Sequence, residues 1–149
     1  MAELGLEIRR HQNAQDVFDD VACARLGINR SDGRCLDIVD QHGQLSAGEL
    51  ARKSELSTGA ITTLLDRLER AGYVRRIPDP ADRRRVLVEL TELARERTWE
   101  IWGPMAESAA AELARYSDAE LVFMRDFLRR GREILAEQTE RVRALPPRP

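Results

Sequence analysis

Two groups of residues in the central third of the chain have the chemistry to bind phosphate. Three consecutive arginines, Arg83-Arg84-Arg85, lie at the tip of a predicted β-hairpin. Upstream, the run Ser57-Thr58-Gly59-Ala60 begins a predicted helix with small and hydroxylic side chains. Small side chains let a backbone approach a groove wall, and the free N–H groups at a helix start attract phosphate. Both groups therefore suit contact with a nucleic-acid backbone.

The charge of the chain is unevenly distributed. Residues 52–85 contain nine Arg or Lys against five Asp or Glu, a net charge of +4, whereas the whole chain has a net charge of −2. The remaining residues therefore carry −6. A local basic face can bind phosphate on a protein that is acidic overall. The alternative for such a charge run is an ordinary solvated surface.

Two short helices are predicted before the hairpin. Ser46 and Glu49 form a capping-box pattern at the start of the first helix, which should run to about Ser54. Ser57 is a good cap for the second helix, which should continue to residue 71 and end at Gly72. A link of about three residues between two short helices is typical of a helix-turn-helix.

The second of these helices is amphipathic. Its apolar residues recur at spacings of three and four and should face the core: Ile61, Leu64, Leu65 and Leu68. On the polar face, Arg67 is the best candidate for a guanine contact. Thr62 and Thr63 could touch a thymine methyl or a phosphate. The alternative is a solvated polar face without a partner.

The hairpin favours the nucleic-acid interpretation. Residues 73–77 and 85–90 are partly alternating, β-branched runs, and residues 78–82 supply the Pro and Asp of a turn. Arginines on a ribbon directly after a helix-turn-helix are typical of a winged helix bound to DNA. We therefore interpret the basic charge as a DNA-binding surface.

These segments resemble the MarR family of winged-helix transcriptional regulators. The matching strings are residues 45–51 (LSAGELA), 62–74 (TTLLDRLERAGYV) and 79–91 (DPADRRRVLVELT). In the family the wing carries an Asp-x-Arg element before a strand and Leu-Thr, and here that element is Asp82-Arg83-Arg84. The resemblance implies that Asp82 orients an arginine by a salt bridge and that Arg84 enters the minor groove. A narrow A·T minor groove attracts arginine through its negative potential.

From residues and resemblance together we predict a sequence-specific DNA-binding transcriptional regulator. The predicted DNA-binding residues lie on the two helices and the wing: Ser46, Ser57, Thr58, Gly59, Ala60, Thr62, Thr63, Arg67, Arg70, Arg76, Asp82, Arg83, Arg84 and Arg85.

The predicted fold is mainly α with a small β-wing, in a single MarR-like domain over residues 1–149. The winged helix should occupy residues 28–91, and long helices in residues 1–27 and 92–145 should form a dimerisation part. Residues 146–149 should be a disordered tail. The last helix carries a seam with alternating spacings of three and four: Leu121, Met124, Leu128, Gly131, Leu135, Gln138, Val142 and Leu145.

Such a seam is typical of helices that pack along their length, although it could also pack on the chain's own core. We expect a homodimer that interleaves the terminal helices of both chains, as the resemblance implies. Its two recognition helices would lie roughly 34 Å apart, one duplex turn, and match a pseudo-palindromic operator. The resemblance also implies a repressor that responds to a small aromatic or phenolic effector.

Three residues are candidates for the effector site. Trp99, Trp102 and His42 could line it, although each is more commonly a core or surface residue. Cys23 could sense oxidants, as an N-terminal-helix cysteine does in some relatives, but a buried Cys is most often a small apolar filler. The two His and two Cys show no metal-ligand spacing. We expect no cofactor and no metal.

Two other classes of function are weaker. An enzyme would need a nucleophile elbow, a phosphate loop or a carboxylate pair, and none of these patterns occurs. A helical protein-interaction adaptor on a winged-helix scaffold would have no need of three arginines on the wing. Two cysteines make no disulfide framework, and there is neither an apolar run of 18 residues nor a signal peptide. We therefore expect a cytoplasmic protein.

Overall fold

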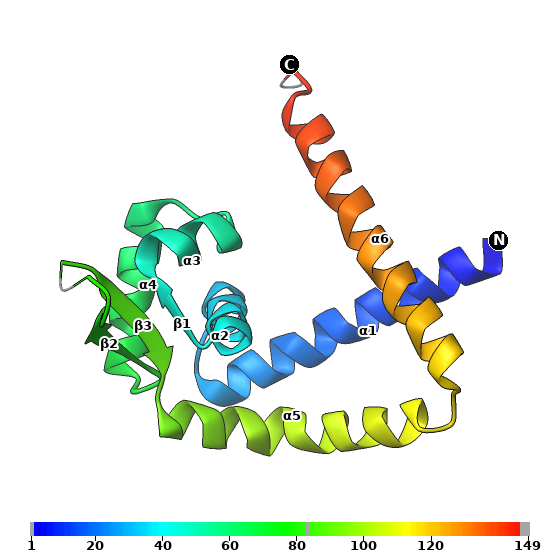
Figure 1. Ribbon diagram of the computed structural model, residues 1–149, viewed down its shortest axis with the longest axis horizontal. Coiled ribbons are helices and arrows are strands. Elements are labelled where there is room, and N and C mark those ends of the chain that lie inside the picture. Colours follow the sequence, from blue (N-terminus) through cyan, green and yellow to red (C-terminus); the bar gives the residue numbers. More distant parts are fainter. Residues whose placement is uncertain (1, 83, 147–149) are drawn as a thin grey trace. The chain divides into compact units, whose positions relative to one another are not determined.

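The computed structural model describes residues 2–82 and 84–146, and it divides after Gly103 into two compact units. The first unit contains α1 (Ala2–Leu26), α2 (Arg30–His42), β1 (Gln44–Ser46), α3 (Ala47–Ser54), α4 (Thr58–Arg70), β2 (Val74–Pro78) and β3 (Val86–Leu90) (Figure 1). Helix α5 (Glu92–Leu113) crosses the division, and α6 (Asp118–Arg143) belongs to the second unit. This confirms the predicted fold class, mainly helical with a small β-wing.

The helix-turn-helix is built from local caps. The capping box at α3 forms as predicted, since the Ser46 backbone N–H donates to the Glu49 carboxylate (2.9 Å) and the Glu49 N–H donates to the Ser46 hydroxyl (3.3 Å). The Ser57 hydroxyl accepts the Ala60 N–H at the start of α4. Between the helices Glu55 adopts a left-handed conformation (φ 60°), and Gly72 does so after α4 (φ 79°).

The sheet has three antiparallel strands in the order β1-β3-β2. The hairpin pairs Val74 with Leu90 and Pro78 with Val86, within one residue of the predicted strands. The first strand was not predicted. It is only three residues long and pairs Leu45 with Val88, so it ties the entry of α3 to the wing.

One hydrophobic core lies under the winged helix. The four apolar residues of α4 are all buried there, as predicted: Ile61, Leu64, Leu65 and Leu68. They pack with buried residues of α2, α3, the sheet and the first turn of α5, among them Val39, Leu50, Val88 and Ala94. The packed apolar face directs the opposite, polar face of α4 to solvent.

Helices α1 and α2 are joined closely. Asn29 and Asp32 form a capping box at the start of α2, and the Arg30 guanidinium contacts three carboxylates of α1, Asp16 (2.7 Å), Asp19 (2.9 Å) and Asp20 (3.2 Å). Gly33 faces α1 so closely that a Cβ there would lie 2.5 Å from the Cys23 sulfur.

In the second unit α6 begins with a capping box between Ser117 and Glu120. None of its 26 residues is buried, and its apolar seam includes Leu128 and Leu135, which are 63% and 59% exposed. In the described residues no helix combines the length and apolarity needed to cross a bilayer. Of the predicted tail, only Pro146 lies within the described residues.

Candidate nucleic-acid interface

The first turns of α4 present a small, hydroxylic surface. Gly59, Thr62 and Thr63 are exposed, because the buried face of α4 lies on the opposite side. The threonine hydroxyls donate to carbonyl oxygens one turn earlier, Thr62 to Thr58 (3.0 Å) and Thr63 to Gly59 (3.2 Å). Each hydroxyl oxygen therefore keeps acceptor capacity toward solvent, and each methyl group is fixed in direction.

Ser57 and Ser46 differ in whether the hydroxyl group can still donate a hydrogen bond to DNA. The Ser57 oxygen accepts the Ala60 N–H (3.2 Å), so its hydroxyl proton can still be donated to a phosphate. The Ser46 hydroxyl instead donates to Glu49 (2.6 Å), and these hydrogen bonds lower the pKa of the Glu49 carboxyl. As the structure stands, Ser46 serves as a cap and Ser57 offers a donor as well.

Arg67 is bound to a partner that sequence reasoning missed. Its Nε and Nη2 donate to the two carboxylate oxygens of Asp32, at 2.9 and 2.5 Å. Asp32 is fully buried, whereas the Arg67 side chain is 43% exposed. The hydrogen bonds from the guanidinium to Asp32 raise the pKa of Arg67. The predicted guanine contact of Arg67 stays a prediction, and it would require this pair to open or to share its donors.

Arg76 joins the wing to the recognition helix. From β2 its guanidinium contacts Asp66 (2.6 Å) and Glu69, both on α4. Arg70, also on α4, donates from Nε to the Asp66 carbonyl oxygen (3.0 Å). Two of the predicted DNA-binding arginines are thus held along the α4 surface, and the acidic side chains beside them reduce the net positive charge there.

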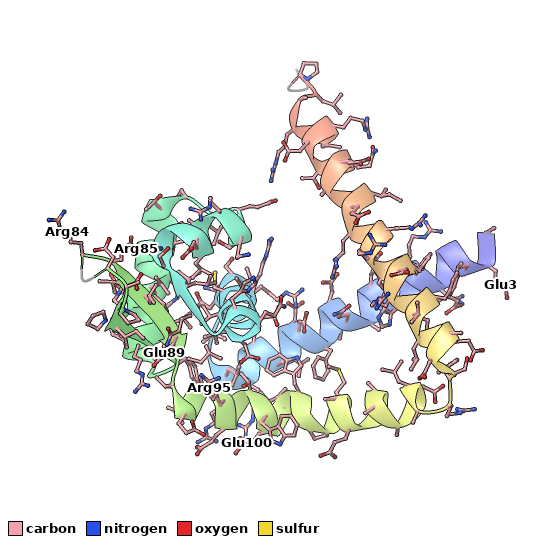
Figure 2. The ribbon with its side chains drawn as sticks, viewed as in Figure 1. Glu3, Arg84, Arg85, Glu89, Arg95 and Glu100 are labelled. Atoms are coloured by element: carbon pink, nitrogen blue, oxygen red, sulfur yellow. The ribbon has the colours of Figure 1, made fainter. Side chains whose placement is uncertain are left out.

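At the wing tip, Arg84 and Arg85 have different surroundings. The Arg84 side chain extends away from the hairpin into solvent (Figure 2), while its backbone N–H donates to the Asp82 carboxylate (3.0 Å). Arg85 lies 3.7 Å from Asp79 and 3.6 Å from Glu49. Arg83 lies outside the described residues.

The salt bridge implied for Asp82 stays a prediction, since Arg83 lies outside the described residues. The Asp82 carboxylate orients Arg84 through its backbone N–H, and the ion pair seen there joins Arg85 to Asp79. Asp79 is nearly buried and also accepts the Ala81 N–H (2.8 Å). The sequence predicts only a turn role for Asp79, because the turn itself accounts for an Asp at that position.

The predicted effector residues are scattered rather than gathered. The Trp102 ring packs edge-on against Phe18, with ring centroids 6.0 Å apart. Trp99 is 64% exposed, and His42 is exposed with its Nδ1 beside the Ile38 carbonyl oxygen (2.9 Å). None of the three lines the cavity of about 290 Å³ formed by Arg25, Leu26, Tyr73, Arg97, Glu100 and Ile101.

Cys23 is buried against α2, with 5% of its surface exposed. Burial raises the pKa of its thiol, and Arg30 opposes that effect only in part. Because oxidants react with the thiolate, a raised pKa slows oxidation. The surroundings therefore fit an apolar filler better than a sensor, and the redox role stays a prediction.

The chain is similar to regulators of transcription over most of its length. The sequence profile of the MarR family matches residues 28–86. An HTH-type transcriptional regulator of Bacillus subtilis, YcgE, is 36% identical over 127 residues, which is 85% of this chain and 82% of YcgE. These relatives are regulators rather than enzymes, in agreement with the exclusion drawn from the sequence.

Solved structures share the fold. A MarR family protein from Bacillus stearothermophilus is 26% identical with a TM-score of 0.67, covering 91% of this chain and 94% of that one. An S. aureus MepR variant bound to an oligodeoxyribonucleotide is 21% identical with a TM-score of 0.59, covering 91% of this chain and 98% of that one. With its helix-turn-helix, cationic wing and these relatives, the chain belongs to the MarR family of DNA-binding transcriptional regulators.

Proposed function

We propose that the protein is a homodimeric, ligand-responsive repressor that binds pseudo-palindromic operators. The exposed apolar seam of α6 is the observation that supports a dimer. A helix of 26 residues with no buried side chain leaves its own unit without a core, and apolar area of this kind is stabilised when another helix covers it. A second copy of α6 presents the same seam.

The DNA contacts that we propose come from two elements of each subunit. The first turns of α4, with Ser57, Gly59, Thr62 and Thr63, would enter the major groove. Arg84 would enter the neighbouring minor groove, where narrow A·T steps attract a guanidinium. Arg70 and Arg76, whose guanidinium groups are already engaged along α4, would contact phosphates at the edge of this surface. Thr58, Ala60, Arg67 and Arg85 are further proposed contacts, and the predicted roles of Ser46, Asp82 and Arg83 stay predictions.

We also propose an effector site in the winged-helix unit. NadR, whose structure was solved in complex with 4-hydroxyphenylacetate, is 22% identical to this chain and shares its fold. That ligand is the model for the effector that we propose. We place the candidate site at the cavity of about 290 Å³ beside Tyr73, since Arg25 there suits a carboxylate. Arg97 is already paired with Glu100 (3.2 Å) and could bind a ligand carboxylate only by exchanging that partner. Trp99, Trp102 and His42 would lie outside it.

The test begins with DNA fragments selected by the purified protein from its source genome. Binding of a selected fragment should lose about 10³–10⁵ in affinity between 50 and 200 mM salt if roughly six to ten phosphates are neutralised. A fragment cut to one half-site should bind much more weakly than the full palindrome. Equal binding of both fragments would contradict the dimer, and binding insensitive to salt would favour the adaptor.

The direction of regulation needs a reporter assay. Among partial relatives, YetL of Bacillus subtilis is named a transcriptional repressor and BadR of Rhodopseudomonas palustris a transcriptional activatory protein. A promoter carrying the selected operator should be silenced by the protein and released by a phenolic acid such as 4-hydroxyphenylacetate. Higher expression in the presence of the protein would make it an activator.

A further inference from the structure

Asp32 is the fully buried acidic side chain of the winged helix. Its carboxylate is 0% exposed and lies under the recognition helix. An ion pair of this kind gives little net stability, because removing the Asp32 carboxylate from water costs about as much as its attraction to the half-exposed Arg67 returns. Hydrophobic residues of similar size would stabilise the fold as well. Unlike hydrophobic residues, the ion pair restrains the orientation of the Arg67 side chain relative to α2.

The geometry of the pair is restrictive. Arg67 approaches Asp32 side-on, with Nε on one carboxylate oxygen (2.9 Å) and Nη2 on the other (2.5 Å). Two parallel hydrogen bonds between planar groups fix angle as well as distance. Arg67 lies one helical turn after Thr63, so this contact limits the rotation of α4 about its own axis in addition to the packing of its apolar face. That rotation determines which side chains of α4 face solvent.

The carboxylate itself has little freedom to move. Asp32 also accepts the Asn29 N–H (3.3 Å), as the third residue of the α2 capping box. Helix α2 is fastened in turn to α1 by the three contacts of Arg30 and by the close approach of Gly33 to Cys23. Asp32 is therefore a fixed point against which α4 is set, as a well-supported site requires.

From this geometry we propose that Asp32 is a positioning residue for DNA recognition. Acting through Arg67, it sets the rotation at which α4 presents Gly59, Thr62 and Thr63 to the base edges. Asp32 does not touch DNA. It controls how well the protein distinguishes its operator from other sequences, a role that rests on the proposed function.

The test compares sequence preference rather than binding alone. The wild-type protein first selects duplexes from a random 30-base-pair pool. The probe is the most enriched duplex, and its shuffled counterpart measures non-specific binding. The specificity ratio, the affinity for the first divided by that for the second, is then measured for Asp32→Asn, for Arg67→Met and for the double variant. Asn at position 32 keeps an acceptor for the capping box, and Met at 67 keeps the length of the side chain.

We expect Asp32→Asn to lower the specificity ratio about tenfold, the size of coupling found between contacting residues. Arg67→Met should lower it by a similar factor, and the double variant by no more than either single change. Shuffled duplex should bind Asp32→Asn about as tightly as the wild type, and dividing by it corrects for the positive charge that Arg67→Met removes. The double variant also guards against misfolding, because it leaves no unpaired buried charge, and its thermal unfolding should return toward that of the wild type.

A matched control is available on the same helix. Asp40 of α2 pairs with Arg95 of α5 (3.7 Å) and not with the recognition helix. Asp40→Asn should leave the specificity ratio unchanged. A wild-type ratio in Asp32→Asn, or losses at positions 32 and 67 that simply add, would overturn the positioning role. A wild-type protein that enriches no duplex would overturn the proposed function and this role with it.

Discussion

Arg84 and Arg85 are adjacent in the sequence, but the structure holds them differently. Arg85 has carboxylates within 3.6 and 3.7 Å, so part of its charge is already balanced. The Arg84 guanidinium extends into solvent, and only its backbone is held. An arginine held at the backbone and open at the side chain is suited to enter a narrow groove.

We therefore expect Arg84→Ala to weaken operator binding by about 1–3 kcal/mol while the fold and the dimer are unaffected. The loss should be largest on operators with an A·T-rich flank, since a narrow minor groove attracts the side chain most strongly. Titration by fluorescence anisotropy on matched A·T and G·C flanks measures both effects. Arg115→Ala removes an exposed arginine paired with Glu112 and should bind like the wild type.

Residues that act through a distant partner were the ones that the sequence could not reveal. The role of Asp79 was obscured because a turn already explains an Asp there. The partner of Arg67 lies 35 residues away on another helix, and no local pattern encodes such a pairing. The polar face of α4 could be predicted, because it follows from the spacing of four leucine and isoleucine residues alone.

At the scale of elements, caps were the most predictable features. The boxes at Ser46 and Ser117 and the cap at Ser57 all formed, since each needs only residues three positions apart. Strand β1 could not be predicted, because three residues are too few to show alternation and its pairing depends on β3. The hairpin was found because its strands adjoin a Pro- and Asp-rich turn.

Two carboxylates that hold elements together should make stability depend on pH. Hydrogen bonds from Ser46 lower the pKa of Glu49, and hydrogen bonds from Gln44 and Arg75 lower that of Glu89. Their contribution is complete above the usual value of 4.5 and is lost as the pH falls through the lower folded value. The free energy of unfolding should therefore decrease below about pH 4.5.

Urea unfolding between about pH 3 and 7 measures this dependence. Glu49→Gln should be less stable near neutral pH and should lose less stability on acidification, because the side chain no longer titrates. Glu107→Gln removes a carboxylate of α5 that accepts no hydrogen bond from the described residues, and it should be as stable as the wild type near neutral pH. Identical slopes for Glu49→Gln and the wild type would contradict the role of the α3 cap.

At the scale of the whole molecule, the exposed apolar seam of α6 is the feature that a dimer would bury. Leu128 and Leu135 lie seven positions apart on one face, and both are largely exposed. If two copies of α6 cover each other, a carboxylate in place of Leu128 would be buried without a partner, which costs at least about 3 kcal/mol.

Leu128→Glu should therefore raise the dissociation constant of the dimer by about 100-fold or more. Light scattering across a concentration series measures it, and affinity for a full palindrome should fall to that for a half-site. Arg130→Glu introduces the same side chain off the seam and should remain a dimer. A wild-type protein that stays monomeric at every concentration would remove the basis for the two-fold operator.

The close approach of Gly33 to Cys23 has a consequence for which substitutions the chain tolerates. A Cβ at position 33 would lie 2.5 Å from the Cys23 sulfur. The space between the two helices therefore holds a side chain at position 23 or at position 33, but not a large one at both. Gly33→Ala alone should cost about 1–3 kcal/mol through overpacking. In a Cys23→Ala background the same methyl fills vacated space, and chemical denaturation should show most of that loss recovered. Homologues with a larger residue at one position should then carry a smaller one at the other.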